Sequence, residues 1–192
     1  MAIFKCKMCG GDLDVLPGVS VCQCEYCDTK QTVPVIENND KVVKLFERSN
    51  LLRIQWEFDK AYGIYENIIA EEPESAEAYW GLLLCQFGIE YVEDPITKKR
   101  IPTCHRSSFE SIGENANFER VKEFADDEAR SVYVEEAKQI EEIRKVMEEV
   151  LQTAKLNVSV AQPVTVSESA KINAPSDVED LDEMRHIEPR GA

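Results

Sequence analysis

The sequence has little histidine, no glycine-rich phosphate loop and no long apolar run. Its two histidines, His105 and His186, stand in no recognisable pattern of a nucleophile with acid–base partners. We therefore expect no enzymatic activity. No segment offers the roughly 20 consecutive apolar residues of a membrane span. The N-terminus also lacks the charged and then apolar pattern of a secretory signal. These absences predict a cytoplasmic protein that does not bind membranes.

Cysteine is concentrated at one end of the chain. Five of the seven cysteines fall in the segment CKMCGGDLDVLPGVSVCQCEYC. Cys6 and Cys9 are separated by two residues, as are Cys24 and Cys27, and this spacing lets one tight turn direct both thiolates at one metal ion. Only the choice of Cys24 preserves this spacing in the second pair, so we interpret Cys22 as a free thiol near the site.

Two such pairs are the usual ligand set of a structural zinc site. We predict a zinc ribbon over residues 1–36, built from short β-hairpins, that binds one Zn²⁺ through Cys6, Cys9, Cys24 and Cys27. A unit of this size buries too little apolar surface to fold without a cross-link, so the metal has a structural task. The same four thiolates also accept iron, and rubredoxin-like electron transfer remains an alternative. Clustered thiols favour a reducing compartment, in agreement with the cytoplasm.

Positive charge is scarce. The chain carries 22 lysines and arginines against 37 aspartates and glutamates, a formal net charge of −15. Many zinc ribbons bind nucleic acid, but phosphate contacts need a basic face, and the ribbon offers only Lys5, Lys7 and Lys30. We therefore expect no nucleic-acid binding, and a nucleic-acid-binding ribbon stays a second alternative.

After the polar break ENND the pattern changes to helical periodicity. Apolar residues recur every three or four positions over residues 45–56 and 61–69, and Pro73 ends the second run before a third begins. We predict a mainly α domain over residues 41–154. A long helix over 128–154 is expected to pack across the others, and a coiled-coil dimer seam is the alternative for it.

Two segments are predicted to lack regular structure. The segment EDPITKKRIPTCHRSSFESIGEN contains two prolines, so we expect a loop in which Cys104 and His105 are ordinary loop residues. It holds the basic cluster of the chain, which we expect to balance neighbouring carboxylates: Lys98, Lys99, Arg100 and Arg106. Residues 155–192 gain proline, serine and acidic residues, and we expect a flexible linker or tail there.

The stretch EFDKAYGIYENIIAEEPESAEAYWGL resembles a tetratricopeptide repeat. Ala61, Tyr65 and Pro73 stand at the family's spacing of small residue, aromatic residue and proline. As a whole, residues 1 to about 154 resemble the N-terminal part of a bacterial family in which a four-cysteine ribbon leads into a tetratricopeptide-like unit. The motifs that carry this resemblance are FKCKMCGGDL, CEYCDTKQTVP, FDKAYGIYENII, EAYWGLLLCQFGIEYVEDP and EEAKQIEEI.

In relatives of that kind the unit precedes a Toll/interleukin-1 receptor domain or further helical repeats. The resemblance therefore implies a non-catalytic adaptor or scaffold that binds a protein or peptide, with a role in bacterial signalling or immunity. In tetratricopeptide repeats the first helix of each pair lines a concave groove. Transferred to this chain, that pattern implies that Arg53 and Trp80 lie in one partly exposed concavity and bind the partner. The oligomeric state is left open.

Overall fold

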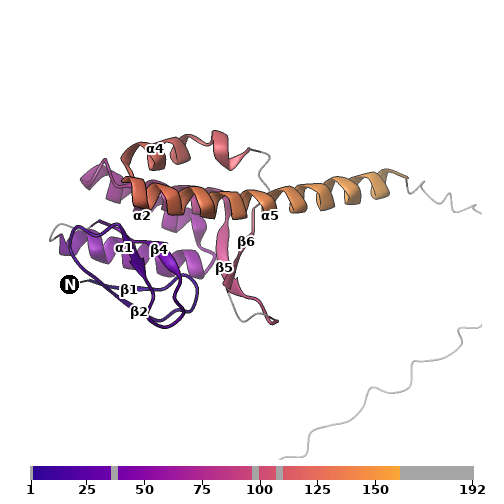
Figure 1. Cartoon of the computed structure of the whole chain (residues 1–192). Coiled ribbons are helices and arrows are strands. Elements are labelled where there is room, and N and C mark those ends of the chain that lie inside the picture. The colour runs from indigo at the N-terminus through magenta and orange to yellow at the C-terminus, as the bar shows by residue number, and fades with distance from the viewer. Residues whose placement is uncertain (1, 36–38, 97–99, 107–109, 161–192) are drawn as a thin grey trace, which may run out of the picture.

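The computed structural model describes residues 2–35, 39–96, 100–106 and 110–160. Over these ranges the chain is mainly helical, with two small antiparallel hairpins at its N-terminus and a third between the helices (Figure 1). The expected class, a mainly α chain that begins with hairpins, is therefore correct. No described helix is long and apolar enough to cross a membrane.

The two N-terminal hairpins hold the paired cysteines in their turns. Strand β1 (Ala2–Lys5) pairs with β2 (Asp12–Val15), and β3 (Val21–Gln23) pairs with β4 (Lys30–Thr32). Strand β2 alternates between exposed and buried residues, so its Leu13 side chain faces the interior. Each CxxC motif begins at the residue after the first strand of its hairpin. The register of the strands therefore fixes where each cysteine pair begins.

Three helices follow and pack in chain order: α1 (Asp40–Ile54), α2 (Phe58–Glu71) and α3 (Ala76–Phe87). Helix α1 begins at Asn39, whose side-chain oxygen accepts a hydrogen bond from the backbone N–H of Val42. Helix α3 ends at Gly88, which adopts the left-handed conformation (φ 62°) that glycine tolerates best. The helical periodicity of the sequence thus located all three helices.

The segment after α3 is a hairpin and not the predicted loop. Strand β5 (Ile89–Glu93) pairs with β6 (Arg100–Cys104), and Cys104 is buried at the end of β6. Two prolines had indicated a loop. Pro102 nevertheless lies opposite Tyr91, because each strand of a two-stranded sheet has a free edge where a missing N–H is tolerated.

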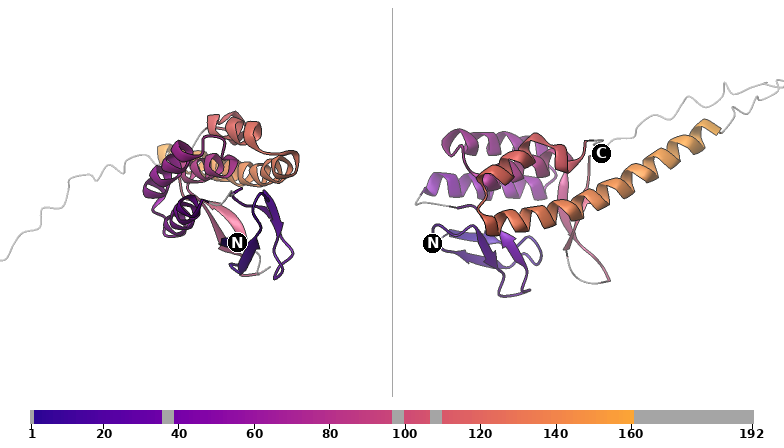
Figure 2. Two further views of the ribbon diagram at one scale, coloured as in Figure 1. Left: turned by 90° about the vertical axis from the view of Figure 1, so that its left-hand side faces the viewer. Right: turned by 45° about the horizontal axis from the view of Figure 1, so that its top comes forward.

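The last described elements are a short 3₁₀ turn, η1 (Ile112–Glu114), and two helices, α4 (Ala116–Phe124) and α5 (Asp127–Val160). Helix α5 lies along the helical body and then projects beyond it (Figure 1, Figure 2). Helix α5 continues to Val160, six residues past the expected domain boundary at residue 154. The rest of the predicted tail, 161–192, lies outside the described residues.

Helix α3 is buried on nearly all sides and separates two apolar cores. The first core joins the N-terminal hairpins to α1, α2 and one face of α3; its members include Phe4, Leu13, Val15, Val42, Phe46, Phe58, Tyr65 and Ile68. The second lies between the other face of α3, the third hairpin, α4 and α5; its members include Trp80, Leu83, Phe87, Ile89, Phe118, Val121, Tyr133 and Ile140. The four-cysteine unit therefore shares a core with the helices.

An ion-pair group ties α5 to the 3₁₀ turn. The Arg144 guanidinium bonds to Glu141 at 2.9 Å and to Glu148 at 2.9 Å, and Glu141 also accepts the backbone N–H of Ile112 at 3.1 Å. The hydrogen bonds from Arg144 lower the pKa of Glu141 below its ordinary value of 4.5. This carboxylate therefore stabilises the fold above the unfolded-state pKa, and its contribution is lost as the pH falls through the folded-state pKa.

We expect Glu141→Gln to lower the free energy of unfolding by about 1 kcal/mol near neutral pH, because the amide keeps the shape but loses the charge-assisted bonds. The difference in the free energy of unfolding between this variant and the unmodified protein should shrink as the pH falls below 4.5. Urea denaturation over a series of pH values measures it. Glu142→Gln, at an exposed position of the same helix, is the control and should change little. A difference that stays constant at acidic pH would contradict the assignment.

Candidate metal centre

The two cysteine turns adopt the same backbone conformation. The Gly10 N–H donates to the Cys6 carbonyl at 3.0 Å, and the Asp28 N–H donates to the Cys24 carbonyl at 2.9 Å. Both Gly10 (φ 74°) and Asp28 (φ 58°) are left-handed, which reverses the chain directly after the second cysteine of each pair. Glycine adopts this conformation freely, and aspartate is one of the few other residues that visits it routinely.

This geometry brings the four predicted sulfur atoms together. The Sγ atoms of Cys6 and Cys27 are 3.7 Å apart, those of Cys9 and Cys24 are 3.5 Å apart, and all four lie within 4.8 Å of one another. A tetrahedral site with Zn–S bonds of about 2.3 Å has sulfur–sulfur edges of about 3.8 Å. The four side chains therefore fit a tetrahedral metal ion, and each close contact joins one turn to the other.

The other cysteines lie apart from this cluster. Cys22 is half-buried in β3, opposite Gln31 of β4, and does not join the four sulfurs. Cys85 is buried in α3, as expected for a small core residue, and burial raises its pKa to about 12. Within the described ranges no second group of three or more metal-ligating side chains exists. The metal-binding potential of the described chain is thus concentrated at one place.

Cys6 and Cys27 differ in acidity when no cation is present. Burial raises the pKa of Cys6 to about 12, whereas the hydroxyl of Thr29, 3.4 Å from Cys27 Sγ, lowers the pKa of Cys27 to about 7. Backbone N–H groups already face the sulfurs: Met8 N lies 3.3 Å from Cys6 Sγ. A bound cation offsets the repulsion between thiolates, so metal binding releases protons and weakens at acidic pH.

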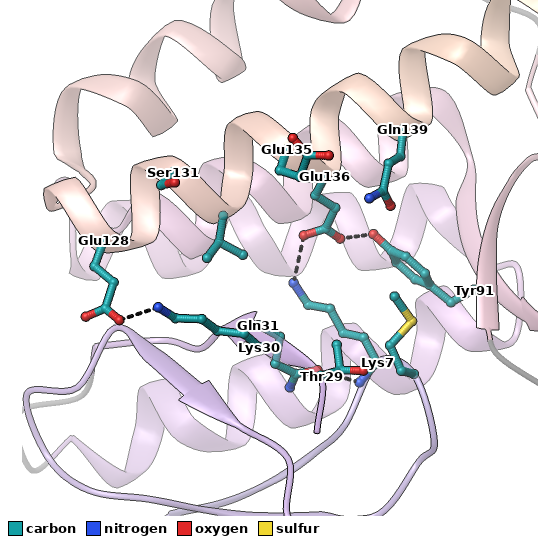
Figure 3. Close-up of a pocket in the computed structure, with 12 residues that line it drawn as sticks. Lys7, Thr29, Lys30, Gln31, Tyr91, Glu128, Ser131, Glu135, Glu136 and Gln139 are labelled. Carbon is teal, nitrogen blue, oxygen red and sulfur yellow. Dashed lines mark hydrogen bonds and ion pairs between the residues drawn. The ribbon is translucent and has the colours of Figure 1, made fainter. Parts of the chain in front are cut away.

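The first turn is anchored to the helices by its own lysine. Lys7 lies between Cys6 and Cys9, and its Nζ is 3.5 Å from a Glu77 oxygen on α3. The same Nζ is 3.7 Å from a Glu136 oxygen on α5 (Figure 3). Burial acts to lower the pKa of Lys7, but the two carboxylates outweigh it and raise the pKa, so the ammonium stays charged.

Further bonds complete this anchor. Glu136 accepts a hydrogen bond from the Tyr91 hydroxyl, and Glu77 accepts one from the Tyr133 hydroxyl at 2.6 Å. Lys30 of β4 pairs with Glu128 at the start of α5, at 2.6 Å (Figure 3). The position of the four-cysteine unit relative to α3 and α5 is therefore set by buried charge as well as by the shared core.

The expectation that Trp80 is partly exposed is wrong. Its side chain is 0% exposed, with ring centroids 6.1 Å from Phe118 of α4 and 5.3 Å from Tyr133 of α5. Helices α4 and α5 cover this face of α3. Arg53 is 6% exposed and donates from Nη1 to the Ile89 carbonyl at 3.1 Å. It lines a cleft that Trp80 does not reach, so the two do not share a concavity.

The residues around the metal centre divide into those that local sequence can reveal and those that it cannot. The cysteines are found from their spacing, whereas nothing in the sequence links Lys7 to carboxylates on α3 and α5.

Comparison with known proteins adds no further assignment: no protein-family model, no curated protein and no solved structure matches the chain.

Proposed function

We propose that the chain is a non-catalytic protein-interaction module whose N-terminal unit is a zinc ribbon. The observation that carries this proposal is the group of four cysteine sulfurs within 4.8 Å of one another. Four protein thiolates fill a tetrahedral shell and leave no position for a substrate. When bound, Zn²⁺ would cross-link the two turns through Cys6, Cys9, Cys24 and Cys27, and it would supply no further chemistry.

The helices support a tetratricopeptide-like scaffold as the second half of the proposal. Ala61 and Tyr65 are buried in the first core, and the Tyr65 ring lies so close to Gly81 that a Cβ there would be 2.3 Å from the ring. The Tyr65 hydroxyl donates to Asn50 at 2.8 Å. Small-residue and aromatic packing of this kind is what the repeat pattern requires. A role in bacterial signalling or immunity rests on the resemblance alone.

A protein or peptide is a better partner for this surface than nucleic acid. The three lysines of the N-terminal unit are all engaged: Lys5 with Asp12, Lys7 with Glu77 and Glu136, and Lys30 with Glu128. Phosphate contacts need basic side chains that are free to replace counterions. Together with the net charge of −15, this argues against the nucleic-acid alternative.

Metal analysis of the purified protein tests the proposal. We expect one zinc ion per chain and a colourless protein, because four thiolates in a tetrahedron suit Zn²⁺. Elemental analysis with a visible absorption spectrum measures both. Strong visible absorption with one iron per chain would favour the electron-transfer alternative. Protein that folds fully without any metal would contradict the structural role of the site.

A further inference from the structure

Arg53 is a buried arginine that forms no ion pair with a carboxylate in the described part of the chain, although its charge opposes the rise in pKa that burial causes at Glu136. Its side chain is 6% exposed, and within the described chain its guanidinium makes one hydrogen bond, from Nη1 to the Ile89 carbonyl. The Nε atom is buried and has no hydrogen-bond partner. The guanidinium carbon also lies 5.9 Å from the centroid of the Tyr91 ring. A guanidinium carries five N–H donors, and burying it without a paired anion is unfavourable.

This arginine lines a cleft of about 560 Å³ between the N-terminal hairpins, α1 and the third hairpin. Arg100 of β6 lines the same cleft, and its side chain makes no hydrogen bond or ion pair with the described part of the chain. The expectation that the basic cluster balances neighbouring carboxylates holds for Arg106, which pairs with Asp59 at 2.8 Å, but not for Arg100. Lys98 and Lys99 lie outside the described residues.

Two of the carboxylates that line the cleft are already engaged. Glu77 is bound to Lys7 and to the Tyr133 hydroxyl. Glu90 accepts the indole N–H of Trp56 and lies 3.2 Å from His105. Of the four basic side chains that line the cleft, Lys5 pairs with Asp12 and Lys7 with Glu77, whereas Arg53 and Arg100 form no ion pair with the described part of the chain.

Exposed apolar side chains lie at the cleft. Leu51 and Ile54 of α1 line it and are 55% and 52% exposed. Trp56, two residues after the end of α1, is 61% exposed and lies beside the cleft, because its indole N–H bonds to the lining residue Glu90.

Trp56 has a φ of 64°, in the position after a helix that glycine normally fills. The backbone N–H of Trp56 donates to the Arg53 carbonyl, and the backbone N–H of Glu57 donates to the Leu52 carbonyl. This is the hydrogen-bond pattern of a helix that ends with a residue in the left-handed conformation.

A bulky side chain in the left-handed conformation is disfavoured by about 1–2 kcal/mol. Backbone strain of this kind is often found where a side chain has a functional task. The Trp56 indole is held over the His105 ring, with centroids 5.0 Å apart, and its N–H is bound to Glu90. The indole is thus fixed beside the cleft while most of its surface stays exposed.

We propose that this cleft binds an acidic peptide segment of a partner protein. One carboxylate of the peptide bonds to Arg53 and Arg100, and neighbouring apolar side chains pack on Leu51, Ile54 and Trp56. A carboxylate suits the site better than a phosphate, because Glu47 and Glu90 also line the cleft and repel a doubly charged group more strongly than a singly charged one. The inference rests on the proposed function as an interaction module and names its class of partner.

Selection of short random peptides displayed against the immobilised full chain tests this inference. Enriched peptides should carry aspartate or glutamate next to leucine, isoleucine or an aromatic residue. A synthetic copy of one enriched peptide, with its carboxylates replaced by amides, should bind about tenfold or more weakly in fluorescence anisotropy. Excess inorganic phosphate should not displace the acidic peptide.

Three variants separate binding from folding. Arg53→Met and, independently, Arg100→Met should weaken peptide binding by about tenfold or more. Trp56→Gly should weaken binding while retaining the melting temperature, because glycine suits the left-handed helix end. Arg120→Met on α4, whose arginine is exposed and paired with Glu123, is the matched control and should bind normally.

Peptides that bind equally well to Arg53→Met and Arg100→Met would overturn this site but leave the proposed interaction function standing. Displacement by phosphate, with equal binding of the amide copy, would overturn the carboxylate assignment. Enrichment of no peptide would count against both the site and the proposed interaction function.

Discussion

Replacing Cys24 with serine is expected to remove the metal and most of the stability of the N-terminal unit. Cys24 is 0% exposed, and its Sγ lies 3.5 Å from that of Cys9. A hydroxyl is a poor substitute for a thiolate ligand. Structural zinc contributes about 10–16 kcal/mol of apparent binding free energy, which is more than such a small core supplies. Metal content and thermal unfolding followed by circular dichroism measure the effect.

The matched control is Cys22→Ser. Cys22 lies two residues away on the same chain segment, is half-buried and stays outside the sulfur cluster. This variant should keep its metal and lose about 1 kcal/mol or less. Retention of metal by Cys24→Ser together with its loss from Cys22→Ser would show that the ligand set is wrong.

The damage from Cys24→Ser should extend into the helices. Phe4 and Leu13 of the hairpins belong to the same core as Val42 and Phe46 of α1, so disordering the hairpins exposes apolar surface on α1. The helical signal should therefore melt at a lower temperature than in the control. An unchanged helical melt in a metal-free protein would instead mean that the two predicted domains fold independently.

Trp80→Ala should be the most damaging substitution away from the metal. It leaves a cavity between α3, α4 and α5, and truncation of a fully buried tryptophan lowers the free energy of unfolding by about 3–5 kcal/mol. Urea denaturation measures the loss. Trp80→Phe is the control: it keeps most of the ring contacts and removes the indole N–H, which has no partner within the described structure, so it should be far milder.

The same pair of variants tests the corrected position of Trp80. If Trp80 bound a partner from an exposed concavity, alanine would weaken binding and leave stability nearly unchanged. A loss of less than about 1 kcal/mol would contradict the buried position that we describe.

The features that the sequence predicted correctly are those encoded over a few neighbouring residues. The cysteine pairs lie within single turns, so their spacing alone indicates where the thiolates point. Helices α1, α2 and α3 follow from apolar residues at helical spacing. The third hairpin was missed because Pro102 is a strong local signal against a strand, and only its pairing with Tyr91 reveals that an edge position accepts it.

The features that could not be predicted depend on segments that are far apart in the chain. Lys7, Glu77 and Glu136 are ordinary surface residue types, and only the folded chain brings them into one buried group. Trp80 was placed by analogy with an open repeat array, whereas α4 and α5 close over it. Trp56 ends a periodic run as if it were helical, and its left-handed backbone is visible only in the structure.

The projecting part of α5 sets both the distance and the direction at which the chain leaves the helical body. Among the described side chains of α5, Met147 is the last that packs against the second core, and residues 148–160 extend the helix beyond it by about 20 Å, with Val150 exposed. Each residue of an α-helix advances the chain by about 1.5 Å and rotates it by about 100°. Deleting two residues would therefore turn whatever follows toward the opposite side, whereas deleting seven would shorten the distance and nearly restore the direction.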